Sequence, residues 1–153
     1  MKKIIYLLFI SAVLTANVNA QDQFWHTDMT KASETAIEKN KPLLMFFTGS
    51  DWCGWCIRLQ KEVFKTSDFK KWADENVVLV ELDFPRRKKL DQNIQIQNYQ
   101  LQHLFKVKGY PTVVFANPEK KEDSKMNLNH LGSTGYIKGG VSEWLNVAKA
   151  IIK

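Results

Sequence analysis

The chain has 153 residues, of which 44% are hydrophobic and 25% are charged, so its length suits one globular domain better than two. Its 7 Gly, 4 Pro and 2 Cys exclude a collagen-like chain, a Gly- and Pro-rich disordered chain and a multiply disulfide-bonded scaffold. The 22 Lys and Arg residues against 16 Asp and Glu residues give a modest formal net charge of +6.

Residues 1–20 have the pattern of a cleavable signal peptide. Lys2 and Lys3 precede an apolar run at 4–14, and small residues follow at the place that a signal peptidase reads. A membrane anchor is the alternative, but the apolar run falls short of the roughly 20 residues that span a bilayer. We therefore expect a periplasmic or secreted protein whose domain covers 21–153.

The first part of that domain alternates helices and continuous apolar runs, which are typical of strands buried on both faces. Asp28 or Thr30 is a suitable N-cap for the first helix. The predicted elements are a helix over about 31–39, a strand over 42–47, a helix from the cysteines to Phe64, a helix over 67–76 and a strand over 77–83. A strand, helix, strand order predicts a parallel crossover.

The second part is more polar and begins with a loop that contains the basic run Arg86–Lys89. Apolar residues at helical spacing then predict a helix that ends at Gly109–Pro111. The remaining predictions are a strand over 112–116, a charged turn over 117–124, a weaker strand over 125–131, a connection that contains Gly132, Gly135, Gly139 and Gly140, and a helix over 141–152. Trp25, Trp72 and Trp144 lie within apolar patterns and are expected in the core.

Both cysteines, Cys53 and Cys56, lie in one C-x-x-C motif. A disulfide that closes so small a ring constrains the unfolded chain little, which argues against a purely structural bond. Zinc binding needs further ligands at a matching spacing, and His26, His103 and His130 are far apart in the sequence. We therefore expect redox chemistry, without a metal or another cofactor.

The spacing of the motif suits thiol–disulfide exchange. Two intervening residues let both sulfurs meet across the first turn of a helix, where unpaired N–H groups and the helix dipole favour a thiolate at the first sulfur. Cys53 is then the nucleophile, and Cys56 is the resolving thiol that releases the mixed disulfide. Gly54 and Trp55 add no cation that would stabilise the thiolate further.

Three segments, Thr48–Cys56, Asp83–Arg87 and Gly109–Thr112, carry a family resemblance. A C-x-x-C between a buried strand and a helix, with a proline before a later strand, is a specific pattern. The chain resembles exported bacterial thioredoxin-like proteins, the relatives of the periplasmic domain of DsbD and of DsbH. This resemblance implies an α/β thioredoxin fold, with a central mixed sheet of four to five strands flanked by helices.

The resemblance also implies a substrate-binding surface around the cysteines. In this family a proline at the position of Pro111 is cis and faces the cysteines, and the backbone of the preceding residue, here Tyr110, pairs with an extended substrate segment. A simple helix stop is the alternative role for Pro111. Trp52, Gly54 and Trp55 are expected to contribute to the same surface, with the two tryptophans forming an apolar rim around the sulfurs.

Two features depart from the pattern of thioredoxins. Thioredoxins carry a buried Asp on the strand before the motif, where this sequence has Met45–Phe47. Glu81, on the neighbouring predicted strand, is a candidate for the proton transfer that this Asp assists, and a solvent-facing carboxylate is the alternative interpretation. Tyr110 is bulkier than the residue of most thioredoxins and is expected to narrow the substrate groove.

The predicted function is an exported protein-disulfide oxidoreductase that works in the reductase direction. Its expected partners are disulfide-containing exported proteins and a membrane electron donor of the DsbD kind, without nucleic acid, and the protein is expected to be a monomer. The basic run at 86–89 is interpreted as a solvated loop rather than a binding site. The alternatives are a non-catalytic thioredoxin-fold binding module or chaperone, or a disulfide oxidase or isomerase.

Overall fold

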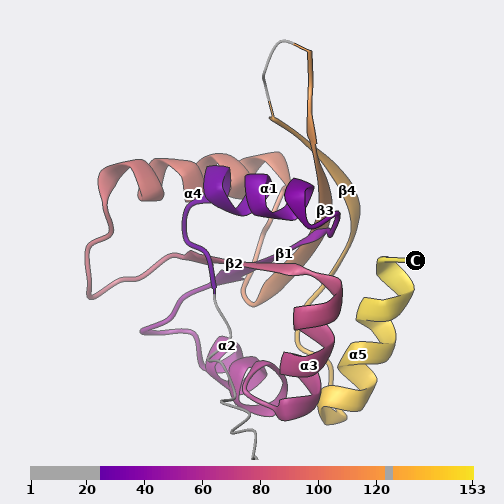
Figure 1. The fold of residues 1–153 in the computed structure, drawn as a ribbon. Coiled ribbons are helices and arrows are strands. Elements are labelled where there is room, and N and C mark those ends of the chain that lie inside the picture. The colour runs from indigo at the N-terminus through magenta and orange to yellow at the C-terminus, as the bar shows by residue number, and fades with distance from the viewer. Residues whose placement is uncertain (1–24, 123–125) are drawn as a thin grey trace, which may run out of the picture.

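The computed structural model describes residues 25–122 and 126–153, which form a four-stranded sheet with helices on both faces (Figure 1). The predicted signal peptide lies outside the described residues. In chain order the elements are α1 (Met29–Glu38), β1 (Leu43–Thr48), α2 (Gly54–Leu59), the π-helical turn η1 (Gln60–Phe64), α3 (Ser67–Asn76), β2 (Val78–Asp83), α4 (Gln92–Leu104), β3 (Thr112–Lys120), β4 (Met126–Thr134) and α5 (Gly140–Ile151). None of these helices combines the length and the apolar character of a membrane span.

The sheet has the strand order β2-β1-β3-β4. β1 runs parallel to β2 and antiparallel to β3, and β3 runs antiparallel to β4. Every residue of β1 is buried, because this central strand is covered on both faces. The predictions of a flanked mixed sheet and of a parallel crossover are therefore confirmed.

Side chains that alternate along β1 contribute to two separate cores. Phe46 packs with the cysteines and Trp144 on the face that α2, α3 and α5 cover. Phe47 packs with residues of α1 and α4 on the opposite face. Figure 1 shows α1 and α4 on one side of the sheet and α2, α3 and α5 on the other. The cysteines therefore belong to the second helix layer.

Side-chain caps decide where several helices begin. The Asp28 carboxylate accepts hydrogen bonds from the N–H groups of Thr30 and Lys31, so Asp28 rather than Thr30 is the N-cap of α1. The hydroxyl of Thr66 caps α3 in the same way, and the carboxylate of Asp91 caps α4. Each cap satisfies N–H groups that have no partner within the helix.

The predicted turn over 117–124 is wrong for its first four residues, because β3 continues to Lys120 and pairs with the start of β4. This hairpin is held by backbone hydrogen bonds, which polar sequences make as readily as apolar ones. Its outer residues are mostly exposed and lack an alternating apolar pattern. The pattern therefore gave no sign of the extension.

The prediction that Gly132 belongs to a connection is also wrong, since this residue lies inside β4. A Cβ atom at Gly132 would lie 2.9 Å from the Ile151 side chain of α5. Glycine therefore allows the last helix to pack closely on the edge of the sheet.

The helix before Pro111 ends earlier than predicted. α4 stops at Leu104, and Lys106 adopts a left-handed conformation with a φ of 52°. The Val107 N–H donates back to the Gln102 carbonyl, so the last turn closes on itself before Gly109 is reached. A helix stop is consequently not the structural role of Pro111.

The three tryptophans expected in the core differ in how deeply they are buried. Trp72 and Trp144 are buried, whereas Trp25 is half-buried and contacts the rings of Phe46 and Phe64. The indole N–H of Trp144 donates to the Gly135 carbonyl at 3.0 Å, which satisfies its polar atom inside the core.

We expect Trp144→Ala to lower the free energy of unfolding by about 3–5 kcal/mol, because it leaves a large cavity and an unpaired carbonyl. Urea unfolding of the oxidised protein measures this change. Val147→Ala is the matched control on the same helix, since Val147 is 37% exposed and should cost less than about 1 kcal/mol. Equal losses for both variants would contradict the assignment of Trp144 to the core.

Candidate functional site

The cysteine pair lies where α2 begins, shortly after the end of β1. Cys53 is the N-cap residue of α2, and Cys56 lies in its first turn. The two sulfurs are bonded at 2.03 Å, and the Cα atoms are 5.3 Å apart. Cys53 is 5% exposed and Cys56 is fully buried, so Cys53 is the residue of the pair that retains contact with solvent.

The start of α2 places a donor on the first sulfur. The N–H of Cys56 donates to the Sγ of Cys53 at a distance of 3.2 Å. The first N–H groups of a helix also carry partial positive charge. The thiolate at Cys53 stays a prediction, and this N–H is the group that would stabilise it.

The turn between β1 and α2 depends on Gly49. Its carbonyl accepts the N–H groups of Trp52 and Cys53, at 3.2 and 2.8 Å. A Cβ atom at Gly49 would collide with the Trp52 indole, so any side chain there would displace the ring. Glycine at this position therefore sets both the turn and the place of Trp52.

Tyr110 and Pro111 form one side of the site. The Tyr110–Pro111 bond is cis, as predicted. The Tyr110 ring meets the Trp52 ring edge-on, with 5.7 Å between their centroids. Its hydroxyl accepts a hydrogen bond from the amide of Gln102 at 2.6 Å. Burial raises the pKa of Tyr110 to about 12, so the phenol stays neutral.

Trp55 belongs to a second aromatic group, on the helix side of the cysteines. Its ring is 56% exposed and lies 5.1 Å from the ring of Tyr136, and the Arg58 guanidinium lies over both rings. Glu62 pairs with Arg58 and accepts a hydrogen bond from the Tyr136 hydroxyl at 2.6 Å. Both tryptophans therefore flank the cysteines, but in separate clusters. Gly54 is exposed, and a Cβ atom there would contact nothing within 4 Å.

The loop that follows β2 is fastened to the cysteine loop by two aspartates. The Asp83 carboxylate accepts the N–H and the hydroxyl of Ser50, at 2.8 and 2.6 Å, and pairs with Lys88 at 2.9 Å. The Asp51 carboxylate accepts the N–H groups of Arg86 and Arg87. These backbone bonds lower the pKa of Asp51.

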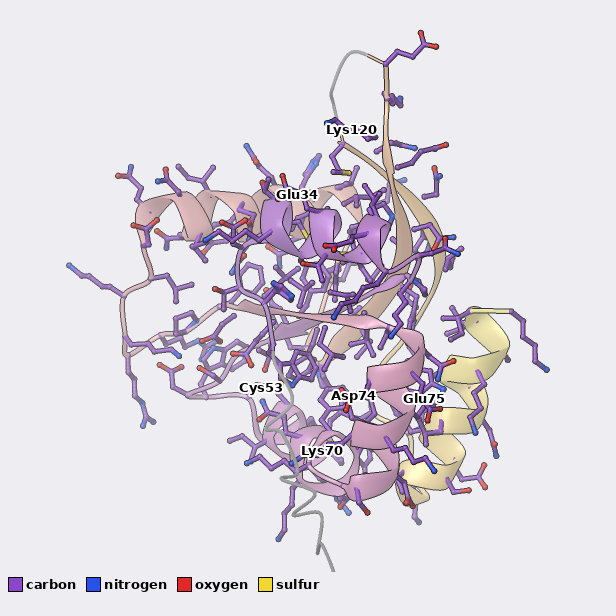
Figure 2. The ribbon with its side chains drawn as sticks, in the orientation of Figure 1. Glu34, Cys53, Lys70, Asp74, Glu75 and Lys120 are labelled. Atoms are coloured by element: carbon purple, nitrogen blue, oxygen red, sulfur yellow. A yellow bond between two sulfur atoms is a disulfide. The ribbon has the colours of Figure 1, made fainter. Side chains whose placement is uncertain are left out.

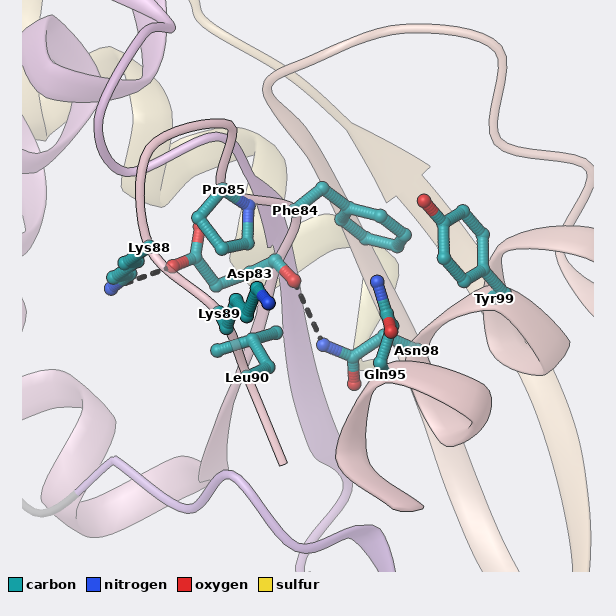
Figure 3. A pocket seen from close by; sticks show the side chains of 9 residues that line it. All are labelled: Asp83, Phe84, Pro85, Lys88, Lys89, Leu90, Gln95, Asn98 and Tyr99. Atoms are coloured by element: carbon teal, nitrogen blue, oxygen red, sulfur yellow. Dashed lines mark hydrogen bonds and ion pairs between the residues drawn. The ribbon is translucent and has the colours of Figure 1, made fainter. Parts of the chain in front are cut away.

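Trp52 adds a third link between the two loops. Its indole N–H donates to the Phe84 carbonyl at 2.8 Å, and the Arg86 guanidinium carbon lies 3.9 Å from the ring centroid. The basic run is thus exposed, as predicted, but it is attached to the site rather than separate from it. A cavity of about 350 Å³ lies between this loop and α4, and Figure 3 shows its walls, with Lys88 bonded to Asp83.

Several residues of the site were not singled out from the sequence: Ser50, Asp51, Arg58, Glu62, Asp83 and Tyr136. Asp51 and Asp83 lie within the segments that carry the family resemblance, but the residues alone gave no sign that they bind the facing loops. Tyr136 reaches Glu62 from a segment 74 positions away, for which the sequence carries no signal.

Glu81 lies on the same face of the sheet as the cysteines but makes no hydrogen bond with either. It is half-buried beside Phe46, its neighbour on β1, and lines a cavity of about 260 Å³. Burial and then the negative charge of Asp83 raise the pKa of Glu81, whereas Lys88 opposes the shift. Its carboxylate is therefore neither fully solvent-facing nor in contact with the sulfurs. Across the described ranges, no three potential metal ligands gather.

Comparison with known proteins places this arrangement in a family. The model of a thioredoxin-like domain matches residues 29–123, which include the cysteine pair, the basic run and the Tyr110–Pro111 bond. The chain belongs to the thioredoxin-like family. The four-stranded sheet with its two helix layers is accordingly a thioredoxin fold, as the sequence resemblance implied.

The chain is also similar in sequence and structure to individual thioredoxin-like proteins. The disulfide bond reductase DsbH of Chlamydia pneumoniae is 33% identical over 123 residues, or 80% of this chain and 74% of that protein. The thioredoxin-related protein DsbJ of the same organism is 31% identical over 123 residues, which are only 34% of its length. A solved structure of DsbH oxidoreductase superimposes with a TM-score of 0.76 at 30% identity and covers 90% of both chains.

The raised pKa of Glu81 makes a prediction about folding stability. Between the ordinary value of 4.5 and the higher folded value, the folded protein binds more protons than the unfolded chain, so stability falls as pH rises through this window. We expect Glu81→Gln to remove this loss, so its free energy of unfolding should rise relative to the wild type as pH increases. Urea unfolding between pH 4 and pH 8 measures the difference.

Glu62 provides a control, because its pKa is shifted in the direction opposite to that of Glu81. Hydrogen bonds from Tyr136 and then from Arg58 lower the pKa of Glu62, so its stabilisation is present at neutral pH and is lost as pH falls through the folded pKa. Glu62→Gln should therefore be less stable than the wild type at pH 7 and approach it in acid. A pH-independent difference for Glu81→Gln would contradict the burial argument.

Proposed function

We propose that this protein is an exported thiol–disulfide oxidoreductase that reduces disulfides of other exported proteins through Cys53 and Cys56. The observation that carries the proposal is the bonded cysteine pair at the start of α2, with the Cys56 N–H directed at the Cys53 sulfur. Similarity to DsbH, which is named a disulfide bond reductase, supports the same activity.

In the proposed reaction the Cys53 thiolate attacks one sulfur of a substrate disulfide. A mixed disulfide forms, the substrate bond breaks, and the departing substrate thiolate takes a proton from solvent. Cys56 then loses its proton and attacks Cys53, which releases the second substrate thiolate. Each cycle moves two electrons from the protein to the substrate and leaves Cys53 and Cys56 bonded, so no cofactor is required.

The surroundings of the cysteines support these separate roles. The Cys53 sulfur receives the helix N–H and is the more exposed of the two, whereas Cys56 is fully buried one turn inside the helix. An attacking thiolate needs both electrostatic stabilisation and access, and Cys53 has both. The resolving thiol needs only to reach the sulfur of its neighbour.

Substrate binding is assigned to the surface around the pair. Trp52 and Tyr110 contact one another on one side, Trp55 stands exposed on the other, and Gly54 leaves the space between them open. An extended substrate segment beside Pro111 would lie along the Tyr110 backbone, close to Cys53. Glu81 is assigned a role in proton transfer. Because it touches neither sulfur, this role is an indirect one through the protein interior.

We further propose that the protein works in the periplasm as a monomer and is kept reduced by a membrane electron donor of the DsbD kind. The reductase direction is supported by the motif itself, in which the helix start stabilises the thiolate without help from a cation between the cysteines. Gly54 and Trp55 supply no cation, and the nearby Arg58 is paired with Glu62. A less stabilised thiolate makes the reduced state less favoured and the couple more reducing.

Insulin reduction with dithiothreitol as the electron source tests the activity. The wild type should accelerate insulin precipitation, and Cys53→Ser should abolish the acceleration, because the attacking thiolate is lost. Cys56→Ser should instead accumulate mixed disulfides with partner proteins at Cys53. Mass spectrometry of the trapped complexes identifies the bonded cysteine.

A non-catalytic binding module or chaperone would behave differently in the same assay. It would bind unfolded chains without accelerating insulin reduction beyond dithiothreitol alone, and serine at either cysteine would leave binding unchanged. Trapping at Cys56 in the Cys53→Ser variant would reverse the assignment of the two cysteines.

Equilibration with glutathione buffers tests the direction of electron flow. We expect a reduction potential nearer to that of thioredoxin, about −270 mV, than to that of DsbA, about −120 mV. Gly54→Arg and Trp55→His, which add a cation beside the sulfur, should each make the potential less negative. A wild-type value more positive than about −180 mV, that of protein disulfide isomerase, would favour an oxidase or isomerase instead.

A further inference from the structure

The loop after β2 is bound to the loop that carries the cysteine pair, and among the described residues only Lys88 of its four basic side chains forms an ion pair. We propose that Arg86, Arg87 and Lys89, here called the basic loop, form a selectivity surface that favours substrate disulfides flanked by Asp or Glu. The inference rests on the proposed oxidoreductase function and names a substrate class for it.

The position of the basic loop is fixed by the cysteine loop itself. Asp51 accepts the N–H groups of Arg86 and Arg87 at 3.0 and 2.7 Å, and the Trp52 indole donates to the Phe84 carbonyl at 2.8 Å. These bonds join residues that are more than 30 positions apart. The basic loop therefore moves with the cysteine loop rather than as an independent tail.

Arg86 brings positive charge to the rim of the site. Its guanidinium carbon lies 3.9 Å from the centroid of Trp52, the residue before Cys53. Arg86, Arg87 and Lys89 are all exposed, so a bound polypeptide can reach their charged groups. A segment that enters along Trp52 and Tyr110 would pass next to Arg86.

The charges of the basic loop remain available to a partner. The Asp51 carboxylate accepts hydrogen bonds from backbone N–H groups, and the Asp83 carboxylate is bonded to Ser50 and Lys88. The ion pairs among the described residues are Lys88–Asp83 and Arg58–Glu62, and neither includes Arg86, Arg87 or Lys89.

The cation on the other side of the cysteines is paired. Arg58, which lies over the Trp55 ring, forms an ion pair with Glu62 at 2.7 Å. Lys89 borders the cavity of about 350 Å³ behind the basic loop, which leaves room for a flanking side chain (Figure 3). A carboxylate of the substrate is the complementary group for this surface, and such rim charges act mainly on association rate and selectivity.

Single-turnover kinetics with three synthetic peptides test the inference. Each peptide contains the same intramolecular disulfide, flanked by Glu, Gln or Lys. The protein is reduced with dithiothreitol and desalted, and peptide thiols are counted after quenching. Each turnover spends the two electrons of one reduced cysteine pair and yields one peptide dithiol.

The double variant Arg86→Gln/Arg87→Gln should reduce the Glu peptide about five-fold more slowly than the wild type does, a size typical of two exposed charge pairs. The Gln peptide should slow less than the Glu peptide, by whatever the loss of the Arg86–Trp52 contact costs, and the Lys peptide should slow least. Arg86→Glu/Arg87→Glu should reverse the preference. Because two proteins are compared on one peptide, the intrinsic reactivity of its disulfide cancels.

Two controls isolate the electrostatic effect. Lys120→Gln/Lys121→Gln removes the same charge from the β3–β4 hairpin, which Figure 2 shows far from Cys53, and should leave all three rates unchanged. In about 1 M salt, where the screening length falls to about 3 Å, the difference between the wild type and Arg86→Gln/Arg87→Gln on the Glu peptide should disappear.

The outcomes separate the inference from the proposed function. If all three peptides slow equally in Arg86→Gln/Arg87→Gln, the basic loop only positions Trp52 and the inference is overturned while the function stands. If the reduced wild type reduces none of the peptides, the proposed function fails and the inference fails with it.

Discussion

The N–H of Cys56 that points at the Cys53 sulfur is the contact on which the site depends. It exists only if α2 begins at Cys53, and α2 begins there because the chain turns sharply after β1. Gly49 makes that turn possible, since a side chain at this position would collide with Trp52. A buried central strand, one glycine and one aromatic ring therefore determine where the sulfurs lie and which of them receives the helix N–H.

The cysteine loop is itself held from the neighbouring strand. Asp83 ends β2 and binds Ser50, while Asp51 reaches back to the loop after β2. Parallel strands end at the same edge of the sheet, so these two loops are neighbours by topology. The loop after β2, although distant in sequence, therefore becomes part of the site. The carboxylates of Asp51 and Asp83 serve loop structure rather than chemistry.

Much of the fold was predictable because β1 and β2 are continuous apolar runs and the helices have clear caps or periodicity. The cysteine roles followed from spacing alone as a hypothesis. The hairpin beyond Ala116 escaped prediction because its pairing uses backbone groups and polar side chains. The attachment of Arg86 escaped for a related reason: its partner Asp51 binds the Arg86 N–H and not its side chain, so no pattern of charges reveals it.

Trp52 connects the chemistry of the site with its surroundings. Its ring contacts both the Arg86 guanidinium and the Tyr110 ring, and its N–H donates to the Phe84 carbonyl. A cation on an aromatic face is attracted by the ring and desolvated less than one in a buried ion pair. Arg86 can therefore stay at the rim with its charge still open to a substrate. The ring next to Cys53 in the sequence thus also holds the Arg86 guanidinium at the rim of the site.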